Sequence, residues 1–362
     1  MRDHPGFAVT SIDVAGRNFS DGGEIQHLFR SNWVNVVTGV GHFSVGGHTH
    51  FASDVALPDM PPIHSTQRTS ADLHHTNAYS YVSIDPIRNV TLTVGGSGDF
   101  FSGDASTKER HQFNPKAGLM WTLPWAPFQN TTLRAAGFRE LKRTLITDQT
   151  LEPTQVAGFN QFFDDGNGTT AWRYGGAIDQ KFCDRLFGGA EYSHRDLHVP
   201  FEFVDPASGE NSVREADWKE RLARAYLLYA PHDWVALRAE WIYERFTRDR
   251  DFTFGVHEVN THRLPLGAGF FHPSGVSAWL RGMYVNQAGD FEPNPGEFRK
   301  GSDDFFLVDA MVSYRLPKRY GFVSIGATNL FDKKFKYHDT DFTNPIIQPE
   351  RMFFARVTLA LP

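Results

Sequence analysis

The sequence predicts an all-β fold: an antiparallel transmembrane β-barrel of about sixteen strands, either complete or part of a larger barrel. Three observations support this prediction: long runs of alternating apolar and polar residues, short turns that alternate with long loops, and no apolar stretch of helix length. Alternation with a period of two is typical of strands, because successive side chains point to opposite faces of a sheet. The runs exceed the usual strand length of about five to six residues and suit a membrane-spanning strand of about 9–11 residues.

The alternation is clearest at residues 235–244, 305–316 and 351–361. In the first of these runs apolar side chains share one face, while Arg238 and Glu240 lie on the other. A charge that faces lipid at the membrane midplane costs roughly 2–4 kcal/mol, so these charges belong in a wet lumen or on a solvent-facing surface. The alternative is a soluble antiparallel sheet with one solvated face.

Glycine, proline and polar turn residues divide the chain into successive strands. The predicted strands lie at residues 24–30, 33–46, 72–84, 89–101, 112–123, 131–142, 156–163, 170–182, 185–199, 218–229, 235–247, 257–271, 276–288, 305–316, 320–331 and 351–361. Residues 1–20 carry no clear pattern. We therefore predict an unpatterned N-terminal segment at 1–20 and a barrel domain at 21–362.

Short turns marked by proline alternate with longer polar loops. The turn prolines are Pro86, Pro124, Pro231, Pro273 and Pro317, and the long loops lie near residues 47–70, 200–215, 289–302 and 332–350. Bacterial barrels show this asymmetry, with short periplasmic turns and longer extracellular loops. A soluble sandwich has no reason to keep it, so the pattern favours the barrel.

The composition excludes several classes of protein. There is no apolar stretch of about 18 residues, which excludes membrane-spanning helices. A formal net charge of −6 argues against nucleic-acid binding. The only cysteine, Cys183, permits neither an internal disulfide nor a cysteine-based zinc site. Aromatic residues make up 14 % of the chain, which suits the aromatic girdles of a barrel and also a Phe-rich soluble core.

A motif near the C-terminus carries a family resemblance. The residues Asn329-Leu330-Phe331-Asp332 resemble the Asn-Leu-Phe-Asp signature near the end of TonB-dependent outer-membrane receptors. As in that family, a loop and a Pro-x-Arg element, here ending at Arg351, lead into a terminal aromatic-rich strand. The resemblance covers about the last sixty residues directly.

This resemblance implies a location in the outer membrane and uptake of a scarce ligand, such as a metal chelate. The implied partners are outer-membrane lipid, the barrel assembly machinery, a small-molecule ligand and, only if a plug domain lies upstream, TonB. In the family about 22 strands surround a plugged lumen, more than are predicted here. No apolar signal-peptide core follows Met1, so we expect a fragment of a longer exported chain.

Two other functions fit the pattern. A plugless outer-membrane porin or export channel, alone or attached to a periplasmic repeat domain, would leave an aqueous channel with about sixteen strands. A soluble β-rich binding protein would show similar alternation. The sequence has no Gly-rich phosphate loop, no Gly-x-Ser-x-Gly elbow and no His-Glu-x-x-His motif, so we expect neither an enzyme nor a bound cofactor.

Charged residues on the polar faces of the strands are the candidates for lumen-facing positions. They are Arg238, Glu240, Arg281, Asp309 and Arg356. These residues would line a channel or contact a plug. The alternative is a ladder of mutually compensating charges without ligand preference.

A metal site at His48 and His50 is a weaker hypothesis. His-x-His spacing on an extended segment places both rings on one face, which suits zinc or copper. The chain has 16 histidines and loops are polar, so a chance cluster is the simpler explanation.

Overall fold

The computed structural model describes most of the chain. The described residues are 8–56, 63–103, 109–142, 150–161, 165–166, 168–204, 211–249, 255–294, 297–338, 347 and 350–360. No helix within these ranges is long and apolar enough to cross a membrane.

Fifteen of the described strands form a single antiparallel sheet in chain order. They are β1 (Ala8–Arg30), β2 (Val34–Ala56), β3 (Ile63–Ile87), β4 (Val90–Gly103), β5 (Arg110–Thr122), β6 (Thr131–Leu141), β9 (Thr170–Cys183), β10 (Leu186–Val204), β11 (Asn211–His232), β12 (Val235–Arg248), β13 (Gly255–Phe271), β14 (Val276–Asn294), β15 (Glu297–Arg315), β16 (Gly321–Thr328) and β17 (Met352–Leu359). Two short strands, β7 (Gln155–Val156) and β8 (Phe159–Asn160), pair only with each other.

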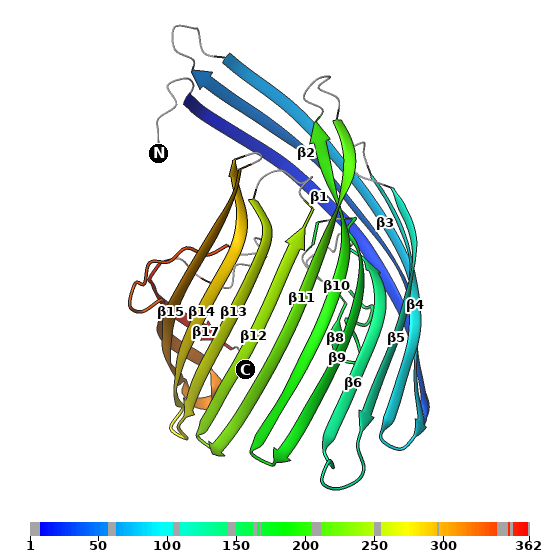
Figure 1. The fold of residues 1–362 in the computed structure, drawn as a ribbon, viewed down its shortest axis with the longest axis vertical. Coiled ribbons are helices and arrows are strands. Elements are labelled where there is room, and N and C mark those ends of the chain that lie inside the picture. Colours follow the sequence, from blue (N-terminus) through cyan, green and yellow to red (C-terminus); the bar gives the residue numbers. More distant parts are fainter. Residues whose placement is uncertain are drawn as a thin grey trace.

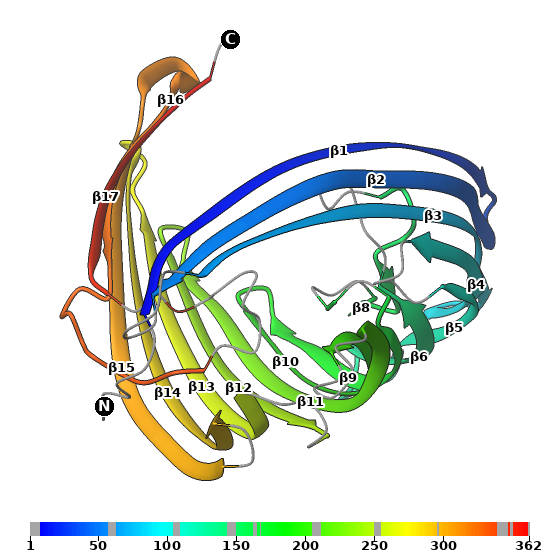
Figure 2. The same ribbon diagram turned by 90° about the horizontal axis from the view of Figure 1, so that it is seen from above.

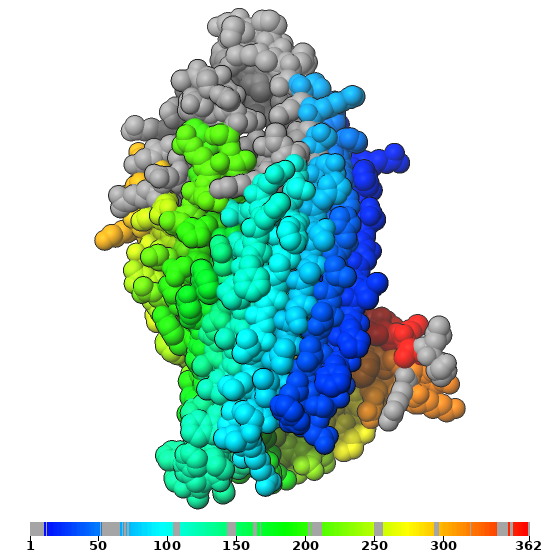
Figure 3. All heavy atoms as spheres, turned by 90° about the vertical axis from the view of Figure 1, so that its right-hand side faces the viewer, coloured from blue at the N-terminus to red at the C-terminus, as the bar shows by residue number. Residues whose placement is uncertain are grey.

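The sheet curls around a central space, as the two views in Figures 1 and 2 show. Short turns, such as those between β9 and β10 and between β11 and β12, gather at the lower end in Figure 1. From outside, strands β1 to β6 form a continuous wall (Figure 3). The edge strands of the sheet are β1 and β17. This architecture is the antiparallel β-barrel that the sequence predicts.

The two faces of the sheet differ in chemistry. Large apolar side chains are exposed on the convex face, and Val94, Phe113 and Ile325 are each more than half exposed there. The concave face carries polar and charged side chains, among them Lys116 and Arg195. An apolar exterior around a polar interior is the arrangement that lipid requires of a barrel, and a soluble barrel shows the reverse.

Several strands are longer than the sequence predicts. Most residues of the loops expected at 47–70, 200–215 and 289–302 belong to strands, because β2, β3, β10, β11, β14 and β15 extend for 19–25 residues. β1 likewise runs from Ala8 across residue 20, so the fold has no boundary there. Beyond the lipid both faces of a strand meet water, and the alternation that marks a half-buried strand is lost.

The strand predicted at residues 156–163 is wrong. β6 pairs directly with β9, and the chain between them returns to the concave face instead of adding a strand to the sheet. There Val156 pairs with Phe159 across a two-residue turn, in which Ala157 and Gly158 have φ values of 47° and 82°. Two positive φ values match a type I′ hairpin turn. Val156 and Phe159 therefore belong to a small inner hairpin, not to a wall strand.

Candidate functional site

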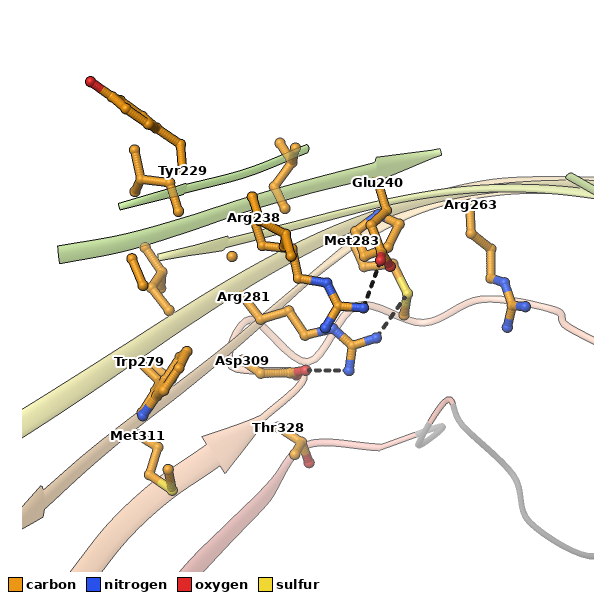
Figure 4. Close-up of a pocket in the computed structure, with 18 of the residues that line it drawn as sticks. Tyr229, Arg238, Glu240, Arg263, Trp279, Arg281, Met283, Asp309, Met311 and Thr328 are labelled. Carbon is orange, nitrogen blue, oxygen red and sulfur yellow. Dashed lines mark hydrogen bonds and ion pairs between the residues drawn. The ribbon is translucent and has the colours of Figure 1, made fainter. Parts of the chain in front are cut away.

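An open cavity of about 780 Å³ lies on the concave face, against strands β10 to β17 and near the short turns. Four arginines contribute to its wall, Arg185, Arg238, Arg263 and Arg281, beside apolar side chains such as Trp279 and Met311. Figure 4 shows the guanidinium groups of Arg238 and Arg281 extending into the same region. A mostly apolar lining with a few convergent polar groups is typical of ligand sites.

Three charged residues of the cavity lie in a row across four strands. Arg238 on β12 lies opposite Gly267 on β13, Gly267 lies opposite Arg281 on β14, and Arg281 lies opposite Asp309 on β15. Residues that face each other in antiparallel strands share one side of the sheet. Gly267 keeps the space between the two arginines open, because a Cβ there would meet only the Arg238 Cβ, at 3.8 Å.

The arginines of the row are more exposed than their carboxylate partners. Arg238 Nη2 lies 2.7 Å from Glu240 Oε1, which also accepts a hydrogen bond from Arg224 at 2.6 Å. The Arg238 side chain is 57 % exposed and that of Glu240 only 3 %. Arg281 Nη1 lies 3.9 Å from Asp309 Oδ2, a long ion pair. The cavity therefore presents positive charge at its surface and keeps the negative charge recessed.

The Asn-Leu-Phe-Asp motif forms a turn that supports this row. The backbone N–H of Asn329 donates to Asp309 Oδ1 at 2.9 Å, so the turn holds the carboxylate that faces Arg281. The buried Asn329 side chain donates to the Lys333 carbonyl at 3.0 Å and accepts from the Lys333 N–H at 2.9 Å. Asn329 adopts a φ of 45°, a left-handed conformation that Asn tolerates better than most residues.

The other residues of the motif shape the start of the connection from β16 to β17. The Leu330 N–H bonds back to β15 at 2.7 Å, and the Phe331 side chain is exposed. Asp332 accepts hydrogen bonds from the Arg351 backbone N–H at 3.4 Å and from Lys334 Nζ at 3.3 Å. These two donors hold the pKa of the Asp332 carboxyl below its usual value.

Four of the five predicted lumen candidates meet at the cavity: Arg238, Glu240, Arg281 and Asp309. Arg356 lies on β17 opposite Ser324, on the same face of the sheet but outside the cavity.

Sequence reasoning missed Arg263 and Trp279, which also line the cavity. The alternation itself could have found them. Arg263 lies opposite Ile242 in the register between β12 and β13, on the face that carries Arg238 and Glu240.

The histidine hypothesis gains no ligand set from the described residues. His48 and His50 both lie on β2, where His48 is exposed and His50 partly buried. No group of three metal-ligating side chains occurs in the described part of the chain.

Comparisons with known proteins find likeness in structure only. No family model and no curated protein matches this sequence. The ferripyoverdine receptor of the Pseudomonas aeruginosa outer membrane is similar with a TM-score of 0.61 and 14 % identity, over 92 % of this chain and 47 % of that one. The copper transporter OprC is similar with a TM-score of 0.61 and 14 % identity, over 96 % of this chain and 59 % of that one. The ferric citrate transporter FecA is similar with a TM-score of 0.58 and 14 % identity, over 96 % of this chain and 55 % of that one.

This chain thus spans about half the length of the structures that it matches. At these identities the likeness concerns the fold, and it agrees with the motif at residues 329–332. The chain has the barrel fold of the TonB-dependent outer-membrane receptors.

Proposed function

We propose that this chain is the barrel portion of an outer-membrane transporter that takes up a small anionic ligand, such as a metal chelate. The observation that carries the proposal is the pair of exposed guanidinium groups, Arg238 and Arg281, beside Trp279 in one cavity. Guanidinium groups bind carboxylates with two parallel hydrogen bonds. The aromatic ring and the nearby Met311 offer surface for the apolar parts of such a ligand.

The convex face supports a location in the outer membrane. Its exposed apolar side chains form the surface that lipid would cover. Near the short turns, Trp125, Trp234 and Phe270 are each at least 40 % exposed, as expected of an interfacial aromatic girdle. In this proposal the barrel assembly machinery inserts the chain, and TonB drives uptake only together with a plug domain.

The structural neighbours support the ligand class. Their names refer to ferripyoverdine, copper and ferric citrate, and all three proteins are receptors or transporters. We therefore assign no enzymatic role to this chain.

Binding of ferric citrate by the purified chain in detergent tests the proposal. Equilibrium dialysis with radioactive iron would measure the affinity. We expect the double variant Arg238→Ala/Arg281→Ala to bind at least about tenfold more weakly, because each lost charge-assisted hydrogen bond contributes about 1.5–3 kcal/mol. Arg356→Ala is the matched control, since it removes an arginine from the same face outside the cavity. Equal affinities in the double variant and the control would place the site elsewhere.

A diffusion channel is the second candidate function. The observation in its favour is the hairpin at residues 155–160, which lies on the concave wall where it would narrow an aqueous passage. Steady single-channel conductance of the purified chain in planar bilayers would favour a channel. Ferric citrate binding without conductance would favour the gated transporter.

A further inference from the structure

The connection between β6 and β9 contains a segment at residues 150–161 that folds back against the inside of the wall (Figure 2). We refer to it as the inner hairpin segment, since β7 and β8 lie within it. Its partners are side chains of β1, β3, β5, β6 and β9, so a single connection is held by five strands.

A buried polar cluster anchors the middle of this segment. The Glu152 carboxylate accepts hydrogen bonds from Tyr81 Oη at 2.5 Å and from Asn77 Nδ2 at 3.2 Å, and Lys116 Nζ lies 4.0 Å away. Lys116 also donates to Gln161 Oε1 at 2.5 Å. All five side chains are at least 96 % buried. A buried charge that lacks its partner is costly, so this cluster strongly favours the seated position.

An aromatic contact holds the hairpin itself. Phe159 is almost fully buried, with the Arg134 and Arg173 guanidinium groups 5.3 and 5.8 Å from its ring centre. Arg173 also donates to the Asn160 carbonyl at 2.6 Å. The wall leaves room for the hairpin at two glycines: a Cβ on Gly175 would lie 2.4 Å from the Phe159 ring, and one on Gly118 would lie 2.8 Å from the Ala157 Cβ.

The beginning of the segment is tied to the edge strand β1. Glu24 accepts hydrogen bonds from the Thr150 hydroxyl at 2.7 Å and from the Leu151 backbone N–H at 2.6 Å. Gln26 donates to the Leu151 carbonyl. The segment therefore spans the concave face from β1 to β9, and it is anchored at both ends and in the middle.

The surface that this segment turns toward the lumen is uncharged. The exposed residues of the segment are Leu151, Thr154, Gln155, Gly158 and Asn160. The charged side chain of the segment, Glu152, is buried against the wall. The arginine row of the cavity lies on other strands of the wall, so the two regions differ in what they offer a passing solute.

From this geometry we infer that the inner hairpin segment is a fixed constriction of the barrel lumen, which sets the size of the passage and adds no charge to it. Its seating is independent of the proposed transport function, whereas its effect on passage rests on that function. The two parts are therefore tested by separate readouts, both on the full chain with Cys183→Ser as background.

The first readout is the rate at which single cysteines react with a membrane-impermeant maleimide. Ala136→Cys places a thiol on the concave face against Val156 and Phe159, and Gly267→Cys places one in the open cavity. We expect Ala136→Cys to react at least about tenfold more slowly, because the seated segment excludes the reagent. Replacing residues 150–161 by a Gly-Ser linker should make the two rates similar. Equal rates before the replacement would overturn the inference.

The second readout is the swelling of liposomes in sugars of increasing size. We expect the linker variant to admit larger sugars than the parent chain, and an unchanged size limit would overturn the constriction. Should the linker variant fail to fold, Gln155→Trp adds bulk to the exposed edge of the segment without touching its anchors. It should lower the size limit, whereas Gln129→Trp, in a short turn outside the lumen, should not. Equal limits for the two Trp variants would also contradict the inference.

Discussion

Charged side chains find different partners in two regions of the concave wall. Between β3 and β9, buried charges such as Lys116 and Arg173 are satisfied by the inner hairpin segment of the same chain. Between β12 and β15, Arg238 and Arg281 remain about half exposed in an open cavity. The same alternation places charges inward in both regions. What differs is the partner, and only the open region leaves charge available to a ligand.

The largest effect is expected where the wall holds its own segment. Glu152→Ala removes the carboxylate that Tyr81, Asn77 and Lys116 surround. We expect it to lower the free energy of unfolding by about 3 kcal/mol, because breaking a buried ion pair leaves charge without compensation. Urea unfolding in detergent micelles, followed by tryptophan fluorescence, measures it.

The control for this prediction is Glu297→Ala. It breaks an exposed pair with Arg299, in which both side chains are more than half exposed. Exposed pairs contribute about 0–1 kcal/mol, so the control should differ little from the parent chain. A loss for Glu152→Ala no greater than that of the control would mean that the covered region is not held by its buried charges.

A glycine exchange compares the two regions by shape. Gly175→Val would drive a side chain into the Phe159 ring, whereas Gly267→Val enters open space beside Arg238. We expect Gly175→Val to cost about 1–3 kcal/mol of stability through overpacking, and Gly267→Val to cost less. Thermal unfolding of both variants, detected as the loss of heat-modifiable migration in gels, gives the comparison. A greater loss for Gly267→Val would show that the cavity is more tightly filled than the wall under the hairpin.

Carboxylates should have opposite roles in the two regions. In the open region Asp309 weakens the positive charge that Arg281 presents. Asp309→Asn keeps the shape and the acceptor for the Asn329 N–H while removing the negative charge. We expect it to tighten ferric citrate binding by about 0.5–1 kcal/mol, a few-fold in affinity, with little change in stability. Weaker binding would assign the carboxylate a direct role in holding the ligand.

The sequence predicts the wall better than the site. Fifteen of the sixteen predicted strands have a counterpart in the fifteen-stranded sheet, because side-chain alternation reports directly which face of a strand meets lipid. The alternation predicts that Arg238 and Arg281 both lie on the polar faces of their strands. Whether the two side chains lie near each other depends on the register between β12, β13 and β14, which no single strand encodes.

The position of the inner hairpin segment could not be predicted from the alternation of side chains. Val156 and Phe159 are residues that a wall strand could also contain, and nothing local shows that they pack against Tyr81 on β3 and Phe138 on β6. The glycines that admit the hairpin, Gly118 and Gly175, look like ordinary strand glycines until the structure brings Ala157 and Phe159 against them. Contacts over such sequence separations are a property of the folded sheet and not of any one stretch of sequence.

The smallest effect is expected at the motif turn, which borders the open region. The Arg351 N–H and Lys334 hold the pKa of Asp332 below its unfolded value. A lowered folded pKa means that this carboxylate stabilises the fold above its unfolded pKa, and that the contribution is lost as the pH falls through the folded pKa. The Asp332 side chain is more than a third exposed, so solvent screens the interaction and the gain is small. Melting temperatures of the parent and Asp332→Asn should therefore differ slightly at pH 7 and converge in acid. A difference that persists in acid would point to the geometry of the turn, in which Asp332 has a φ of 52°, and not to its charge.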